Sequence, residues 1–315
     1  MNRKALITSL SGYHLTKREI LLLRKYKPWG IILFKRNIKN YKQIKNLIKR
    51  IRYVLKDNKY PILIDEEGGT VSRLGNIIDN TKFSQRFFGK LQETNYFMNS
   101  KLYEIYLNKI CYILKDIGIN INTVPVLDKH YKSTNKFLSN RVYSSKIKII
   151  QDLGNKCVDV YNKNNISTVI KHLPGHGLSK VDSHKKLPIV DKNIKFLKKN
   201  DFSCFKNTKS KFAMTGHILF KRIDKKNCAT HSKIIIDQII RKEIKFKGII
   251  ISDDIGMKSL KFSLVENGIR SLMAGCNLAL YCGGKYNESL KLLKKLPIID
   301  KFTKKKTSEF YRFLR

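Results

Sequence analysis

The feature that most limits what this chain can fold into is a regular alternation of short apolar runs with longer amphipathic stretches. Eight runs of four or five residues are too short to be helices and are predicted to form strands. They span residues 5–8, 30–34, 62–65, 119–122, 167–171, 212–215, 248–252 and 278–281. Between them, stretches such as 41–55, 103–117, 148–163 and 231–243 carry apolar residues at helical spacing on otherwise charged faces.

This alternation of strand and helix predicts a parallel sheet covered by helices, and eight strands are the number that a closed (β/α)8 barrel needs. The 315 residues suffice for one such barrel, and neither a linker rich in Pro, Ser and Gly nor a sequence repeat divides them. The sequence therefore predicts a single TIM-type α/β barrel over residues 1–300, with its active site at the C-terminal ends of the strands. Residues 301–315 are expected to be a basic C-terminal tail with room for a short helix.

Several polar residues stand where the predicted strands end. Asp65 ends the third run, and Lys171 and His172 lie at the end of the fifth. His217 follows the sixth run, and Asp253 follows the seventh. Because the strands of a (β/α)8 barrel all end on the same face, we expect these side chains to converge on one site.

The segment from Lys171 to His184 is the strongest candidate for that site. It reads Lys-His-Leu-Pro-Gly-His-Gly, then four residues, then Asp-Ser-His, and it holds three of the seven histidines of the chain. Its Pro and Gly residues favour a loop. Asp182 and His184 are two apart, which in extended backbone places both side chains on one side, where the carboxylate would orient the imidazole for acid/base work. The alternative is an incidental surface ion pair.

The other two histidines of this segment admit several interpretations. His172, together with Lys171, can donate hydrogen bonds to sugar hydroxyls, or it can be a hydrogen-bonded core residue. His176 has no evident chemical role and is expected to make a structural contact within the loop. Pro174 and Gly175 break the helix that a His-x-x-x-His metal pair would need, so no metal is expected.

Two further segments supply carboxylates and a cation. Asp253 comes directly after a strand and is predicted to be a nucleophile that attacks the anomeric carbon of a sugar, whereas Asp254 is the better candidate to cap a following helix. In residues 65–73, Asp65 can accept two hydrogen bonds from vicinal hydroxyls. Arg73 can reach back over the site once the double glycine of this segment turns the chain.

Composition disfavours some function classes. The 65 Lys and Arg against 24 Asp and Glu give a formal net charge of +41, but lysine is spread through nearly every segment. A dedicated nucleic-acid role is therefore not favoured, and only weak, nonspecific polyanion binding is expected. The six cysteines have no C-x-x-C pair, which fits free thiols in a reduced, cytoplasmic compartment. Since no apolar run reaches the ~18 residues of a membrane span, no membrane partner is expected. The protein is also expected to be a monomer.

Taken together, these residues resemble glycoside hydrolase family 3, and specifically its single-domain bacterial β-N-acetylhexosaminidases of peptidoglycan recycling. The family's stretch K-H-F-P-G-H-G, four residues and D-S-H is matched from Lys171 to His184, with Leu173 in place of the phenylalanine. The family's D-Q-E-G-G-R-V-Q-R is matched over residues 65–73, S-D-D-L-S-M over 252–257 and A-P-V-L-D over 124–128, and its R-S-Y/F-x loop is echoed at Arg141. The departures at Glu66, Thr70, Leu173 and Gly256 remove no assigned catalytic group.

The resemblance implies a role for each matched position. Asp253 would be the nucleophile, His184 the proton donor and acceptor, and Asp182 the group that orients His184. The residues that would bind the terminal N-acetylglucosamine are Asp65, Arg73, Arg141, Lys171 and His172. The family cleaves with retention, through a covalent glycosyl-enzyme and without a cofactor. It acts in the cytoplasm on N-acetylglucosaminyl-anhydromuramyl peptides, in cell wall biogenesis, cell division and cell shape.

Two alternatives stay open on the sequence alone. A related β-glucosidase is the first, although such relatives usually take a glutamate acid/base from another domain, for which this chain has no room. The second is a degenerate barrel that binds polyanions or nucleic acid through its positive charge. The intact trio of Asp182, His184 and Asp253 weighs against that second alternative.

Overall fold

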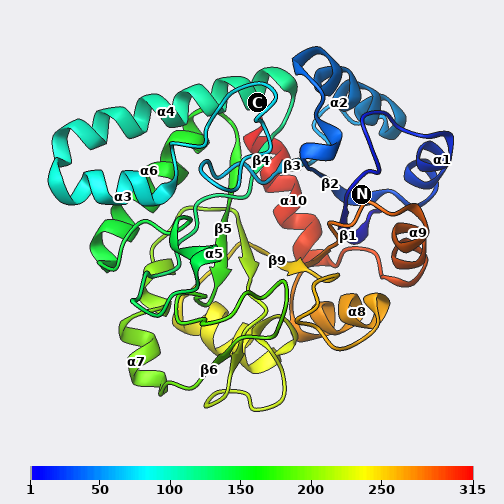
Figure 1. The fold of residues 1–315 in the computed structure, drawn as a ribbon. Helices are drawn as coiled ribbons and strands as arrows, with labels where there is room; N and C mark the ends of the chain where they lie inside the picture. Colours follow the sequence, from blue (N-terminus) through cyan, green and yellow to red (C-terminus); the bar gives the residue numbers. More distant parts are fainter. Residues whose placement is uncertain (1, 315) are drawn as a thin grey trace.

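The computed structural model describes residues 2–314, and its central feature is a closed barrel of eight parallel strands (Figure 1). Around the barrel the strands follow the order β1-β10-β9-β7-β5-β4-β3-β2. Their bounds are Lys4–Thr8 (β1), Pro28–Leu33 (β2), Ile62–Ile64 (β3), Ile121–Asn122 (β4), Ser167–Leu173 (β5), Phe212–Thr215 (β7), Ile249–Asp254 (β9) and Leu278–Leu280 (β10). The predicted (β/α)8 barrel is confirmed, and every predicted strand lies within two residues of its observed bounds.

Helices surround the barrel, as Figure 1 shows. The α-helices are Lys17–Tyr26 (α1), Tyr41–Leu55 (α2), Gln85–Thr94 (α3), Tyr96–Ile117 (α4), Lys136–Ser139 (α5), Ile147–Lys163 (α6), Ile194–Lys199 (α7), Leu264–Ala274 (α8), Tyr286–Lys295 (α9) and Lys301–Phe313 (α10). Short 3₁₀ turns cover Lys35–Asn37 (η1), Phe202–Phe205 (η2) and Ala229–His231 (η3), and a small two-stranded sheet joins Ile189–Val190 (β6) to Leu219–Phe220 (β8). Within residues 2–314, no helix is long and apolar enough to cross a membrane.

Helix α2 illustrates why the amphipathic stretches fold as predicted. The Asn40 side chain accepts a hydrogen bond from the backbone N–H of Gln43 and so caps the first turn, and Lys56 ends the helix in the left-handed conformation. Ile44, Leu47 and Ile51 are among the buried residues, at the spacing of one helical face. The stretch 231–243 departs from a regular α-helix, because Ile235–Glu243 (η4) is π-helical.

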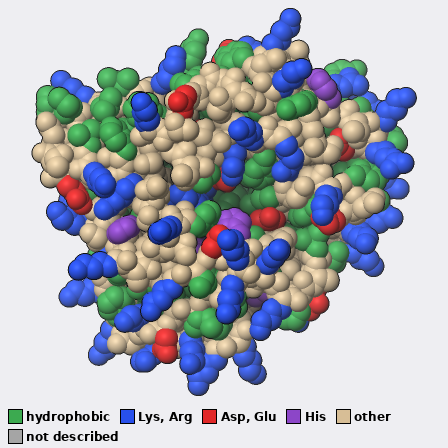
Figure 2. Space-filling model, in the orientation of Figure 1, with side chains coloured by type: hydrophobic (Ala, Val, Ile, Leu, Met, Phe, Trp, Pro, Cys, Tyr) green, Lys and Arg blue, Asp and Glu red, His purple; other side chains and the backbone are tan. Residues whose placement is uncertain are grey.

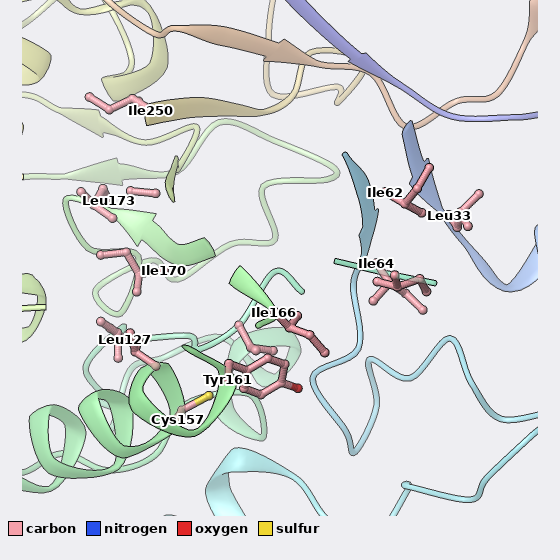
Figure 3. Close-up of a cluster of buried hydrophobic side chains, with 14 of the residues drawn as sticks. Leu33, Ile62, Ile64, Leu127, Cys157, Tyr161, Ile166, Ile170, Leu173 and Ile250 are labelled. Atoms are coloured by element: carbon pink, nitrogen blue, oxygen red, sulfur yellow. The ribbon is translucent and has the colours of Figure 1, made fainter. Parts of the chain in front are cut away.

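The main core lies between the strands and the helices outside them. Figure 3 shows Cys157 and Tyr161 of α6 close to Leu127 and Ile166 in a cluster of buried side chains. The Tyr161 hydroxyl also accepts a hydrogen bond from Asn122 Nδ2 of β4, 2.8 Å away. These contacts therefore pack α6 against β4 and β5. They hold in place the C-terminal end of β5, which carries Lys171 and His172.

The segment predicted to be a basic tail is part of the core, and this prediction is corrected. Lys301–Phe313 forms helix α10, which is drawn in red near the centre of Figure 1. Its Phe310 is fully buried against two barrel residues, with ring centroids 5.3 Å from Phe212 and 6.4 Å from Trp29. The indole N–H of Trp29 donates a hydrogen bond to Thr307 Oγ1 at 2.9 Å. The many lysines of the segment make this buried face hard to recognise in the sequence. In the structure, the buried face closes one end of the barrel interior.

Candidate active site

The residues predicted from the strand ends meet at one pocket of about 300 Å³. Figure 2 shows a hollow near the centre of the visible face, bordered by His and acidic side chains, while Lys and Arg are spread over the whole face. The predicted site residues that line the pocket are Asp65, Arg73, Arg141, Lys171, His172, His184 and Asp253. Asp182 lies behind His184 and contacts it directly.

A chain of alternating charges forms one wall of the pocket. Arg73 contacts Asp65 at 3.1 Å, and Lys171 Nζ lies 2.6 Å from both Asp65 and Glu67. Arg141 completes the chain with two hydrogen bonds of 2.8 Å to the carboxylate of Glu67. The Lys171, Glu67 and Arg141 side chains are only 2%, 1% and 6% exposed, so each of these charges depends on its neighbours for compensation.

The neighbouring cations keep the two carboxylates of this chain ionised. Burial alone would raise the pKa of Asp65, but the charges of Lys171 and Arg73 outweigh it and the net shift is downward. At Glu67, burial would likewise raise the pKa, but the charges of Arg141 and Lys171 outweigh it, and the pKa of Glu67 is also lowered. Both carboxylates are therefore ionised hydrogen-bond acceptors at any pH near neutrality.

The two adjacent carboxyl groups at the end of β9 have different environments. Burial would raise the pKa of Asp253, but the charges on His217 and His172 and a backbone hydrogen bond from Asp254 lower it. The pKa of Asp254 is raised, chiefly by burial. Neighbouring carboxyls whose pKa values move apart take different roles, and Asp253, whose pKa is lowered, lines the pocket.

Asp254 does not cap a helix, and that prediction is corrected. Its Oδ1 accepts hydrogen bonds from the backbone N–H groups of Gly256 at 3.1 Å and Cys282 at 3.0 Å. The next helix, α8, begins ten residues later and is capped by Ser263. Asp254 therefore ties the end of β9 to the residues that follow β10, which holds the backbone beside Asp253.

Asp182 and His184 form the expected dyad. His184 Nδ1 donates to Asp182 Oδ1 at 2.8 Å, because the carboxylate can only accept, and this leaves Nε2 for proton exchange. The backbone there is a turn and not the extended segment that the two-residue spacing suggested, since Asp182 Oδ1 also accepts from the backbone N–H of His184 at 2.9 Å. Asp side chains favour such local turns, and the turn brings the two groups together just as well.

The base of the loop is fixed by a buried carboxylate that sequence reasoning assigned no role. Asp128 accepts hydrogen bonds from His172 Nδ1 at 2.8 Å and from the backbone N–H of His176 at 2.6 Å. His176 Nε2 in turn lies 3.1 Å from Ser183 Oγ, and Ser183 is the residue between the two members of the dyad. The expected structural contact of His176 within the loop is therefore confirmed, and it links the end of β5 to the dyad.

Three residues with structural roles in this geometry were not singled out from the sequence, and the contacts of a fourth were not predicted. Glu67 and Asp128 lie within motifs quoted for the family resemblance, so their positions were noted but not their contacts. His217 was noted at a strand end, and its Nε2 donates to the backbone carbonyl of Asp254 at 2.9 Å. Phe137, which also lines the pocket, gave no signal, because one aromatic residue in a four-residue helix has no distinctive pattern.

A buried carboxyl beneath the loop makes stability depend on pH. Burial raises the pKa of Asp201 to about 6, and the side chain packs against Gly175 with no hydrogen bond to its Oδ1. Because the pKa of Asp201 is higher in the folded protein than in the unfolded chain, this carboxyl does not reduce the stability of the fold below its unfolded-state pKa. The free energy of unfolding then falls as the pH rises through about 6. We expect Asp201→Asn to be more stable than the parent at pH 8 by about 3 kcal/mol, because the pKa rises from 3.8 to about 6 and one pKa unit is worth about 1.4 kcal/mol.

Urea unfolding of both proteins between pH 4 and pH 8 measures this difference. It should be near zero at pH 4, grow with pH and level off above about pH 6. Asp159→Asn, at a carboxylate that is 48% exposed, is the control and should show no such growth. A constant difference across the pH range would contradict the assignment.

Metal ligands are not gathered at this site. Within residues 2–314, no group of three or more His, Cys, Asp or Glu side chains is arranged to hold a metal ion. The chemistry that the described residues offer at this pocket is a half-buried carboxylate, Asp253, and a carboxylate-oriented imidazole, His184. Such a pair suits displacement at carbon combined with proton transfer to and from oxygen.

Comparisons with known proteins agree with this chemistry. Over residues 9–307 the chain matches the Glycosyl hydrolase family 3 N terminal domain. A protein named Beta-hexosaminidase from Haemophilus influenzae is 30% identical over 308 residues, which cover 93% of this chain and 85% of that protein. A Beta-hexosaminidase from Glaesserella parasuis is 30% identical over 290 residues, covering 88% of this chain and 80% of the relative.

Solved structures share the fold over nearly the whole chain. NagZ from Neisseria gonorrhoeae, in complex with N-trifluoroacetyl-D-glucosamine, superimposes with a TM-score of 0.88 at 24% identity, covering 100% of this chain and 91% of that one. The β-N-acetylglucosaminidase from Thermotoga maritima gives a TM-score of 0.77 at 25% identity, covering 98% and 66%. The family match extends over almost all of the barrel, and residues from each of the matched motifs except 124–128 line one pocket. This chain therefore belongs to glycosyl hydrolase family 3 and is a glycoside hydrolase.

Proposed function

We propose that this protein is a retaining exo-β-N-acetylglucosaminidase that removes terminal β-linked N-acetylglucosamine from peptidoglycan fragments. The observation that carries the proposal is that Asp253 and the dyad-bound His184 line one small pocket together with the expected sugar-binding residues. A volume of about 300 Å³ is at the lower end of ligand pockets, which suits a single terminal sugar.

In the first step, an Asp253 carboxylate oxygen attacks the anomeric carbon while the bond from that carbon to the glycosidic oxygen breaks. His184, protonated at Nε2, gives this proton to the departing oxygen, and Asp182 stabilises the imidazolium beforehand. The products are a glycosyl ester on Asp253 and the released alcohol. The downward shift in the pKa of Asp253 supports this role, because the nucleophile has to be ionised.

In the second step, the now neutral His184 removes a proton from a water molecule whose oxygen attacks the same carbon. The ester bond breaks, Asp253 regains its charge and His184 regains its proton. Two inversions at one carbon give net retention of the β configuration. An imidazole is suited to this pairing, because a second carboxylate would repel the charge on Asp253.

The alternating charges would hold the sugar during both steps. Asp65 accepts hydrogen bonds from hydroxyls, and Arg73, Arg141, Lys171 and His172 offer donors around it. The N-acetylglucosamine-type compound named with the Neisseria gonorrhoeae structure supports an N-acetyl sugar as the ligand. The net charge of +41 favours anionic aglycones, and peptidoglycan fragments with free carboxylates fit that preference. Six free cysteines support action in a reducing compartment such as the cytoplasm.

A comparison of substrates tests the proposal. We expect 4-nitrophenyl β-N-acetylglucosaminide to be hydrolysed with the β-anomer as first product by NMR, and the matching glucoside to react far more slowly. Anhydro-muropeptides should lose their terminal N-acetylglucosamine. Activity on the glucoside alone would favour the β-glucosidase alternative. No hydrolysis of either substrate, together with tight RNA binding at physiological salt, would favour the polyanion-binding alternative.

A further inference from the structure

The imidazole of His184 is fixed mainly to its own loop. Both hydrogen bonds with Asp182 are local, since one carboxylate oxygen binds the ring and the backbone N–H of the same residue. The His184 side chain is 54% exposed. These contacts orient the ring relative to the loop, but they do not determine how the ring stands relative to Asp253 on the barrel. A proton donor has to lie within hydrogen-bond reach of the glycosidic oxygen, so some contact from outside the loop is needed.

Phe137 provides that contact. Its ring meets the His184 ring edge-on, with centroids 4.7 Å apart and planes at 78°. Aromatic pairs favour this geometry. Both residues line the pocket, and Phe137 lies in α5, on the segment that follows β4 and precedes α6.

The Phe137 ring is itself anchored to the sugar-binding wall. The guanidinium carbon of Arg141 lies over this ring, 4.7 Å from its centroid. Arg141 is held by two 2.8 Å hydrogen bonds to Glu67, and both of those side chains are buried. A continuous set of contacts therefore runs from the buried ion pair through Phe137 to the exposed imidazole.

The backbone before α5 is joined to the same loop. Thr134 Oγ1 donates to the carbonyl of Gly177 at 2.8 Å, and Asn135 donates from its backbone N–H to Ser179 and from Nδ2 to Lys180, each at 3.1 Å. These bonds hold the loop backbone beside α5 but do not contact the imidazole. Phe137 adds the one contact that acts on the ring itself among those described for this segment.

We propose that Phe137 is a positioning residue, which holds the His184 imidazole over the glycosidic oxygen and so sets the efficiency of proton donation. This inference rests on the proposed function, because it takes His184 as the acid/base. It predicts that loss of the ring harms only reactions that need a proton. It also predicts that an aromatic replacement restores them.

Aryl β-N-acetylglucosaminides with different leaving groups provide the test. A 2,4-dinitrophenolate departs without a proton, whereas a phenolate needs one. For Phe137→Leu, we expect kcat/KM for the phenyl substrate to fall about tenfold, the upper end for an aromatic contact, while kcat/KM for the dinitrophenyl substrate changes less than about twofold. Phe137→Tyr should retain both values. His184→Ala should show the same selectivity with a larger loss, about 10²-fold or more on the phenyl substrate.

Controls separate positioning from loss of structure or of binding. Phe302→Leu is matched, because Phe302 also carries a guanidinium over its ring, from Arg241 at 5.3 Å, but lies on α10 away from the pocket. It should leave both substrates unaffected. A disturbed Arg141 would weaken binding of the shared sugar and lower both kcat/KM values equally. Equal losses in Phe137→Leu, or no rescue by tyrosine, would overturn the inference while leaving the proposed function intact. Inactivity of the parent protein on both substrates would instead overturn the proposed function.

Discussion

Asp253→Gly is expected to lower the hydrolysis of a β-N-acetylglucosaminide by about 10⁴-fold or more, as removal of a nucleophile does in other enzymes with covalent intermediates. The glycine leaves a space beside the anomeric carbon that a small anion can enter. Added azide should therefore restore cleavage of an activated substrate. Because azide would attack from the face that Asp253 occupies, the product should be the α-glycosyl azide, which NMR identifies.

Asp254→Gly is the matched control for the nucleophile. Its carboxylate accepts hydrogen bonds from the backbone of Gly256 and Cys282, so its loss should disturb the end of β9 without removing the attacking group. We expect a partial loss of activity that azide does not restore. Rescue at Asp254 with an α-product, and none at Asp253, would mean that the roles of the two carboxylates are reversed.

Glu67→Gln is expected to destabilise the protein by about 3–5 kcal/mol, because it leaves buried Arg141 without its charged partner and leaves Lys171 with Asp65 alone. Lys171 and Arg141 both depend on this carboxylate, at distances of 2.6 and 2.8 Å. The same change should raise KM, since these cations are expected to bind the sugar. Urea unfolding at neutral pH and steady-state kinetics on the folded fraction measure the two effects.

An exposed ion pair serves as the comparison for Glu67. Glu104 contacts Lys156 at 3.0 Å but is 50% exposed, so Glu104→Gln should have little effect on stability and none on KM. Similar unfolding midpoints for the two variants would show that the buried charges are compensated by water or by other groups. The alternating chain would then have no structural importance.

The positions of the barrel strands could be predicted because apolar runs buried on both faces leave a clear signal. The run 212–215 coincides with β7, and no predicted strand is off by more than two residues. Helix α2 was equally clear, since its buried residues repeat at helical spacing. The π-helical winding of Ile235–Glu243 was not predictable, because the hydrogen-bond offset depends on how the segment packs and not on its pattern of apolar residues.

The site was predictable to the extent that strand ends and motifs located it. Asp65 directly follows β3, and Lys171 and Asp253 lie near the C-terminal ends of β5 and β9, positions that barrel geometry brings together. Contacts between separate loops left no trace in the sequence. The Phe137 ring against His184 is such a contact, because 47 positions separate the two residues and neither lies in a regular pattern with the other.

Two incorrect predictions have a common cause, which is that polar residues were judged from their neighbours in sequence. Asp254 seemed placed to cap a helix, yet its partner Cys282 lies at the end of another strand. The lysines after residue 300 suggested a basic tail with room for only a short helix, although Thr303, Thr307 and Phe310 form a buried stripe at helical spacing. This spacing is visible in the sequence. The burial of these side chains, and not the charge of the lysines around them, determines where the segment lies.

The helix that closes the barrel also bears on the order in which the protein takes shape during synthesis. Strand β1 pairs with β10, so it cannot complete its hydrogen bonds until β10 has been synthesised. Likewise, Trp29 packs against Phe310, which the ribosome adds 281 residues later. Every residue assigned to chemistry has by then left the ribosome. A nascent chain that ends before α10 would hold the complete set of reacting groups around an interior still open to water, so the acquisition of activity should coincide with the translation and packing of α10.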